Sequence, residues 1–591
     1  MPETTFSPGV FLTENDQSQI TQGPIEAGAA ILGPTVIGPV NVPTLVTSYS
    51  QYKALFGAAF VTGGASQEYL TSIAAYNYFN QGGASLLVTR VASGSYTPAT
   101  ANVRSIGNVN ATTSSFQLET LSVGVVMNNS GAIGTAGNLI TGSDQNIRWE
   151  VTAVNTGSGV FSLIIRRGDD TTNSKTILET WNNLSLDPNQ NNYIEYVIGS
   201  QRNSVQLDSS NSQYYIQPQG AYTTKSNYVR VVPNTVAATP NYFDAAGNPR
   251  TAFTGSLPAL GSGSVGGAFT GATGDLFGCF RTAPLNLNQS ISGSAVANTA
   301  ANNVQGLVDT DYAIAINLLQ NKDEYQFNIV TAPGLNSLNA PASTAGLVSL
   351  ASDRGDNIAV IDMVGYNSNV TSVIAQASTF DNSYAATYWP WVQVRSQETG
   401  RVQFVPPATV IPSVYEYNDR VAAAWWAPAG VDRGGLGNVI QSERKVTFND
   451  RNLLYAGKVN PIATFPGVGG PAIYGQKTLQ SKNSALNRVS VRRLLIELKS
   501  FIGQIGQTLV FEPNTQVTRN KFLNQVNPYL ESVQQKQGLY AFEVVMDDTN
   551  NTPDTIDRGM LVGAINIKPT IAAEVIMLTF NIMPTGTTFN V

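Results

Sequence analysis

The sequence predicts a multidomain α/β and α+β protein with an inserted β-rich region and extended β-arms at both ends. At 591 residues the chain is too long for one hydrophobic core. Strand and helix patterns alternate before residue 95 and again after residue 304, whereas the stretch between them is rich in Gly, Ser, Thr and Asn. We therefore divide the chain into an N-terminal arm (1–28), an α/β core (29–95 plus 304–444), one or two inserted β-rich outer domains (96–303), a C-terminal α+β domain (445–574) and a C-terminal arm strand (575–591).

The first part of the α/β core has the order strand, helix, strand. Apolar residues predict strands at 29–36, 44–47 and 85–91, and helical spacing predicts a helix at 67–80 that ends at two glycines. The same pattern resumes near residue 309. There we expect strands at 327–331, 358–363 and 388–394, and helices at 342–354, 371–378 and 413–426.

The inserted region predicts alternating strands separated by turns, at 148–154, 160–166, 193–198 and 228–232. Residues 255–274 are close to a low-complexity sequence, and we expect them to form a flexible surface loop. Within them, residues 261–266 match the letters of a GxGxxG nucleotide-binding pattern. No clear strand precedes this match and no helix follows it, so it does not predict a nucleotide site.

The C-terminal domain predicts two amphipathic helices. The first uses the apolar residues Val491, Leu494, Leu495, Leu498, Ile502 and Ile505. The second starts at a cap on Asn514 and uses Val517, Phe522, Val526, Leu530 and Val533. Arg488, Arg492 and Lys499 fall on one face of the first helix, with Arg493 beside it and Glu497 in reach of Arg493. This basic face is either an ordinary solvated surface or a docking surface for an acidic partner.

Both ends of the chain read as strand-like arms. Val10, Phe11 and Leu12 follow a turn signal near the N-terminus, and Ile576, Leu578, Phe580 and Ile582 alternate with other residues near the C-terminus. An unpaired apolar strand promotes aggregation unless something pairs with it. Strand addition to a neighbouring subunit would supply that partner, although chain ends are also often simply disordered.

The composition excludes several functions. The net charge of −6 argues against nucleic acid as a partner. The chain has no histidine and one cysteine, Cys279, so triads based on histidine, imidazole metal sites and disulfides within the chain are ruled out. We predict no catalytic residues, no cofactor and no metal. The start lacks a signal peptide and no apolar run reaches membrane-spanning length, so we expect a protein made in a cytoplasm and not inserted into a membrane.

Several short motifs, in order along the chain, resemble contractile tail sheath proteins of myovirus-type bacteriophages. They are Ser7-Pro8-Gly9-Val10, Tyr49-Ser50-Gln51-Tyr52-Lys53-Ala54-Leu55-Phe56-Gly57, Tyr78-Phe79-Asn80-Gln81-Gly82-Gly83, Val88-Thr89-Arg90-Val91, Asn460-Pro461-Ile462, Tyr474-Gly475-Gln476-Lys477-Thr478-Leu479, Val491-Arg492-Arg493-Leu494 and Phe511-Glu512-Pro513-Asn514. Tyr474 and Lys477 stand where the family often has Trp and Arg. Residues 96–303 match nothing in the family, as variable outer insertions would.

The resemblance implies a structural subunit of a phage tail with a sheath-type α/β core. Such subunits form hexameric rings that stack as a helix around a tail tube and contract to drive the tube through the host envelope. It implies that the arms add strands in adjacent copies, that the C-terminal domain faces the tube, and that baseplate and tail terminator proteins are further partners. Our first choices for tube contact are Arg488, Arg492, Arg493 and Lys499. The expected location is the virion, after synthesis in the host cytoplasm.

Two other functions stay open from the sequence. A virion adhesin or fibre-like protein would use the inserted β domains to recognise glycans, and it would typically be trimeric. A hydrolase based on two carboxylates would need those groups to face a groove, which a sequence neither shows nor excludes. The sequence also leaves open the host and whether the protein comes from a phage tail or from a headless injection particle.

Overall fold

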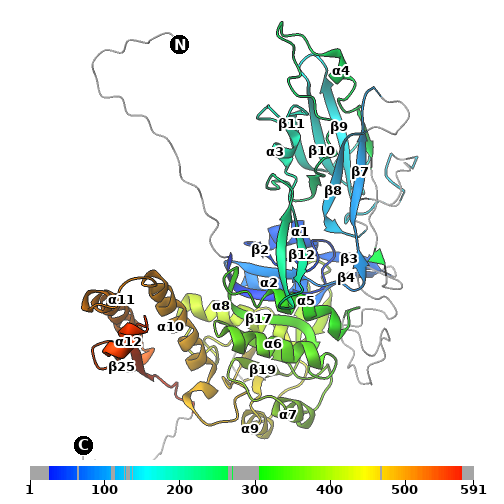
Figure 1. Ribbon diagram of the computed structural model, residues 1–591. Coiled ribbons are helices and arrows are strands. Elements are labelled where there is room, and N and C mark those ends of the chain that lie inside the picture. Colours follow the sequence, from blue (N-terminus) through cyan, green and yellow to red (C-terminus); the bar gives the residue numbers. More distant parts are fainter. Residues whose placement is uncertain are drawn as a thin grey trace, which may run out of the picture.

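The computed structural model describes residues 25–62, 65–107, 114–124, 127, 134–135, 137–140, 142–263, 269–270, 305–465 and 469–574. Its centre is an eight-stranded sheet (Figure 1). In sheet order the strands are β2 (Thr44–Val46), β5 (Leu86–Arg90), β1 (Ile25–Gly33), β17 (Tyr325–Asn336), β18 (Ile358–Asp362), β19 (Ala385–Trp389), β23 (Asn460–Thr464) and β24 (Pro471–Ile473).

The six inner strands of this sheet are parallel, and the two edge strands, β2 and β24, run antiparallel to their neighbours. Helices cover both faces, because strands that are buried on both sides need apolar partners on both sides. Successive residues of β1 show this directly. Ala30 and Leu32 pack into the hydrophobic core on one face, and Ala29 and Ile31 into the core on the other.

The helices on the two faces of the sheet are α1 (Tyr49–Phe56), α2 (Leu70–Asn80), α5 (Ala313–Leu318), α6 (Pro341–Arg354), α7 (Val370–Ser378), α8 (Ile411–Val421) and α9 (Phe448–Ala456). The four predicted core helices are present as α2, α6, α7 and α8, with ends that differ by up to five residues, and α1, α5 and α9 were not predicted. Shorter elements around them are β3 (Ala59–Thr62), β4 (Ala65–Glu68), β20 (Val392–Arg395), β21 (Val402–Val405), β22 (Val439–Ser442) and the 3₁₀ turns Asp309–Tyr312, Pro407–Thr409 and Ala485–Asn487.

The central sheet is larger than the core that the sequence outlined. Strand β1 already pairs with β17 at Ile25, a position that we had placed in the arm. Strands β23 and β24 lie beyond residue 444, yet they complete one side of the same sheet. Local patterns do not reveal this, because sheet membership depends on which strands pair.

The inserted region forms a two-layer β-sandwich that stands away from the core (Figure 1). One layer contains β14 (Val229–Val231), β8 (Ser114–Val123) and β7 (Pro98–Arg104); the other contains β11 (Ile177–Ser185), β10 (Val160–Arg167), β9 (Ile147–Asn155) and β15 (Gly261–Gly263). Its remaining elements are β6 (Ser95–Tyr96), β16 (Phe269–Thr270), α3 (Ile194–Ile198), α4 (Thr251–Thr254) and the hairpin β12 (Arg202–Asp208) and β13 (Gln213–Gln219).

Three details of the insertion differ from the prediction. Residues 194–198 form the short helix α3, where the sequence predicted a strand. Residues Gly261–Gly263 form a strand paired with β9, where the sequence predicted a flexible loop. The β12–β13 hairpin reaches back to the core, and the backbone amide of Tyr214 donates a hydrogen bond to Asn317 Oδ1 in α5 at 2.8 Å. The insertion is therefore braced against the core as well as covalently joined to it.

The C-terminal domain contains α10 (Val489–Thr508), α11 (Gln516–Gln535), α12 (Pro553–Asp557) and a hairpin of β25 (Leu539–Val545) and β26 (Ala564–Pro569). A separate hydrophobic core joins the two long helices and the hairpin. Thr515, not Asn514, caps α11, because the Thr515 side chain accepts the hydrogen bond from the backbone of Thr518. The predicted core position Val517 is 78% exposed.

Candidate assembly surfaces

Arg493 joins helix α10 to the core. Its side chain is 4% exposed, forms an ion pair with Asp419, and donates from Nη1 to Asp419 Oδ1 at 2.8 Å. Its guanidinium lies 4.7 Å from the ring centre of Tyr415, which like Asp419 belongs to α8. Burial alone would lower the pKa of Arg493, but the nearby carboxylate of Asp419 reverses this and raises it. Arg493 is therefore a charged clamp inside the chain.

Arg492 is also turned inward. It is 4% exposed, its guanidinium lies 3.9 Å from the ring centre of Tyr384, and it donates a hydrogen bond to Ser383 Oγ. Burial lowers its pKa. The sequence placed Arg492 and Arg493 on a docking surface, but the structure buries both. The reason is that the start of α10 packs directly on the core, so its basic side chains find partners there.

Arg488 binds the last residue that the structure describes before the C-terminal arm. Arg488 Nε lies 2.5 Å from Glu574 Oε1, and Arg488 Nη2 donates to Glu574 Oε2 at 2.8 Å. Tyr455 also donates to this carboxylate, and Gln476 Nε2 donates to it at 3.1 Å. The base of the arm is thus held against the core by three side chains.

Lys499 is exposed and lies farther along α10. Its Nζ donates to the hydroxyl of Tyr384 at 3.1 Å. Of the four residues first chosen for tube contact, Lys499 is the one whose charge stands at an exposed position, because Arg488 is half-buried and the other two are buried.

The β25–β26 hairpin is an incomplete sheet. The two strands pair from Leu539 with Pro569 to Val545 with Ala564. Alternate residues of β26, including Ile565 and Ile567, pack toward α11, and those between them are exposed. Within the described part of the chain no third strand pairs with either one, so both outer edges present unpaired backbone groups.

The turn between α10 and α11 exposes an apolar tip. Phe511 is 102% exposed and has a φ of 71°, a left-handed conformation that is unfavourable for a large side chain. Val510 beside it is 59% exposed, so the tip exposes two adjacent apolar side chains. Backbone strain of this kind is concentrated at functional positions.

The predicted arm residues cannot be compared with this geometry. Val10, Phe11, Leu12, Ile576, Leu578, Phe580 and Ile582 lie outside the described residues. Within the described ranges, no group of three or more His, Cys, Asp or Glu side chains is placed to hold a metal ion. No described helix is both long and apolar enough to cross a membrane.

Comparison with known protein families identifies a match in the C-terminal domain. Residues 481–583 match the phage tail sheath C-terminal domain family. The chain is 31% identical over 243 residues to the tail sheath protein of Vibrio phage KVP40, covering 40% of this chain and 36% of that protein. It is 36% identical over 188 residues to the tail sheath protein of Enterobacteria phage T4, covering 32% of this chain and 28% of that protein. The matched regions therefore span only about a third of the length of these relatives.

A structural comparison covers more of the chain than the sequence comparisons do. A sheath tail protein from Listeria innocua superposes with a TM-score of 0.51 over 93% of each chain, at 10% identity. This likeness shows a sheath-type fold. The resemblance to tail sheath proteins and the fold class predicted from the sequence are thus both confirmed.

Sequence reasoning missed the residues that hold these surfaces together. Asp419 lies 74 positions before Arg493 in the sequence, so no local pattern links them, and the predicted partner Glu497 was only the nearest carboxylate. The unusual backbone at Phe511 also gives no sequence signal beyond the following Glu512-Pro513 turn. The available sequence signal for the burial of Arg493 was its position near the start of α10, among apolar residues.

Proposed function

We propose that this protein is the structural subunit of a contractile phage tail sheath. Copies form hexameric rings that stack around a tail tube, and contraction of the stack drives the tube through the host cell envelope. The observation that carries the proposal is the β25–β26 hairpin. It has two open edges, and it lies in the domain that matches the phage tail sheath C-terminal family.

The arms are the strands that complete this hairpin in neighbouring copies. Strand addition provides backbone hydrogen bonds, and the alternation of Ile576, Leu578, Phe580 and Ile582 provides an apolar face like that of β26. A two-stranded sheet is marginal by itself, whereas three or more strands with an apolar face are stable. Linking copies in this way keeps rings connected while they move past each other.

The described geometry separates the arm from its own hairpin. After β26 the chain returns to the core, where Arg488, Tyr455 and Gln476 hold Glu574. The arm therefore starts on the core and not at the edge of β26. This supports pairing with another copy.

The tail tube is the partner proposed for the C-terminal domain, with contact through Lys499 and the apolar tip at Phe511. Baseplate and tail terminator proteins would bind the two ends of the stack. The protein acts in the virion after synthesis in the host cytoplasm, and its role is structural and not enzymatic. The positive charge of Lys499 would pair with an acidic surface on the tube.

The arm is tested by a matched pair of variants. In the first, Ile576, Leu578, Phe580 and Ile582 are all replaced by Ser; in the second, the intervening Met577, Thr579, Asn581 and Met583 are replaced instead. The first should abolish long tubular polymers in negative-stain micrographs, while the second should retain them, because only one face of an added strand packs on the receiving sheet. Normal polymers from both variants would contradict the proposal.

Deleting either arm is a second, coarser test of the same proposal, and it removes none of the described residues. Removal of 1–24 or 575–591 leaves β1 and Glu574 in place, so the core should unfold at the same urea concentration as the full chain. Polymer formation should be lost. A loss of core stability after either deletion would show that the ends fold onto their own copy.

Tube contact is tested separately by Lys499→Glu, with the exposed Lys482→Glu as control. The first should weaken co-sedimentation with polymerised tube protein and leave ring formation intact. Equal co-sedimentation of both variants would remove Lys499 from the contact.

A further inference from the structure

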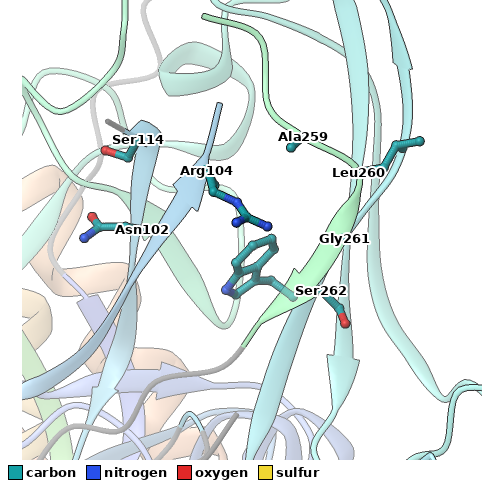
Figure 2. A pocket seen from close by; sticks show the side chains of 8 residues that line it. Asn102, Arg104, Ser114, Ala259, Leu260, Gly261 and Ser262 are labelled. Carbon is teal, nitrogen blue, oxygen red and sulfur yellow. The ribbon is translucent and has the colours of Figure 1, made fainter. Parts of the chain in front are cut away.

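The inserted domain contains a cavity of about 270 Å³ at the seam between its two sheets (Figure 2). It is lined by Asn102, Arg104, Ser114, Trp149, Ala259, Leu260, Gly261 and Ser262. The family match begins at residue 481, and the proposed assembly does not use this part of the chain.

The seam forms because one segment crosses from one sheet to the other. The backbone amide of Ala259 donates to the carbonyl of Arg104 on β7 at 2.7 Å, and Ser105 forms a bridge with Pro258. Only two residues later, Gly261 and Gly263 pair with Val151 and Trp149 of β9. The crossing holds the two sheets apart at this corner, and the cavity occupies the gap.

Glycine lets β15 lie close to Trp149. Gly261 and Gly263 are two residues apart on β15, so they share one face of the strand. A Cβ on Gly263 would lie 2.5 Å from the indole ring of Trp149, and so that position requires glycine. Ser262 between them turns the other way, and its hydroxyl accepts a hydrogen bond from Arg148 Nη2 at 3.3 Å.

The opposite wall of the cavity supplies hydrogen-bond donors. Asn102 and Arg104 are alternate, exposed residues of β7, while Ala101 and Val103 between them lie in the core. Ser114 is the direct partner of Arg104 in the β7–β8 ladder. Figure 2 shows the Arg104 side chain extending toward the strand that carries Gly261 and Ser262.

One group at the cavity, the Arg104 guanidinium, forms no hydrogen bond or ion pair within the described residues, whereas Arg148 and Arg166 nearby are both paired with Asp170. Trp149 is 8% exposed, and its Nε1 is buried, so the indole contributes apolar surface to the cavity and not a hydrogen-bond donor. No carboxylate lines the cavity.

We propose that this cavity binds the oxyanion and ring of one acidic sugar residue, with a carboxylate or phosphate group on Arg104. A guanidinium binds such groups through two parallel hydrogen bonds. Trp149 lines the same cavity and offers apolar surface to the ring carbons. A bare anion would leave most of the volume empty. The site is additional to sheath assembly, because it lies on the inserted domain.

The proposal is tested with the full chain by ligand-observed saturation-transfer NMR. The probes are glucuronic acid and glucose 6-phosphate, with glucose, acetate and inorganic phosphate as the separate parts. Glucuronic acid or glucose 6-phosphate should bind, and the parts should bind at least tenfold more weakly. The shared chemistry is an anionic sugar, and the two acidic probes distinguish its sources.

The variant Arg104→Met should weaken binding of the acidic sugar at least tenfold, which equals about 1.4 kcal/mol. Arg250→Met is the matched control, since Arg250 is an exposed arginine of the same inserted region outside the cavity. Circular dichroism checks that both variants fold. Absence of binding, equal binding to both variants, or equally strong binding of acetate or phosphate alone would each overturn the proposal.

Discussion

The central sheet and the β25–β26 hairpin are built on opposite principles. The central sheet has eight strands, and its inner strands are buried on both faces by helices of the same chain. The hairpin has two strands, one covered face and two open edges. The core is complete in one copy, whereas in the proposed assembly the hairpin is completed by strands from other copies. On that proposal stability and assembly depend on different sheets, so a variant can change one without the other.

The largest expected effect is on the stability of the central sheet, through the buried carboxyl group of Asp362. Asp362, at the end of β18, is 3% exposed; burial raises its pKa to about 8, although a hydrogen bond from the backbone of Ala408 opposes this. Its usual pKa of about 3.9 means that the folded state holds more protons than the unfolded state between these values. The contribution of Asp362 to stability should therefore be fully present below about pH 4 and be lost as pH rises to about 8, by up to about 5 kcal/mol.

Asp362→Asn should remove this pH dependence, because an amide has no charge to bury. Urea unfolding followed by tryptophan fluorescence at pH 5 and pH 8 measures it, with the exposed Asp323→Asn as control. A slope that is unchanged in Asp362→Asn would show that this carboxyl is not the source.

A second pair of variants compares the two sheets directly. Ile329 in β17 is fully buried, so Ile329→Ala should lower the free energy of unfolding by about 2–5 kcal/mol. Ile567 in β26 is only half-buried, and Ile567→Ala should cost about 1 kcal/mol in the isolated chain. Urea unfolding of the unassembled protein measures both. Equal costs would break the distinction between a complete and an incomplete sheet.

The smallest expected effect concerns the strained tip. Phe511→Gly should stabilise the isolated chain by about 1 kcal/mol, because glycine adopts a positive φ without the clash that Phe511 suffers and the exposed ring contributes no burial. Phe511→Ala is the control, since it removes the ring and keeps the clash. Differential scanning calorimetry compares their unfolding temperatures, and a Gly variant no more stable than the Ala variant would contradict the strain.

The sequence predicted features that depend on neighbouring residues better than features that depend on residues far apart in the chain. The core strands and helices depend on local apolar patterns, and so elements such as 342–354 and 358–363 were predicted nearly to the residue. Sheet membership and ion pairs depend on distant residues. That is why β23 was assigned to the wrong unit, and why Arg493 was placed on the surface before its distant partner Asp419 was known. The cavity at Trp149 was missed for the same reason, because Gly261 and Gly263 meet it only across the sheet.

The attachment of Glu574 to Arg488 determines where tension on the C-terminal end is borne. Tension on the residues that follow Glu574 would act first on the ion pair with Arg488, before it reaches the hairpin upstream. In the proposed assembly, this attachment would transmit force between copies without separating the strands of the β25–β26 hairpin.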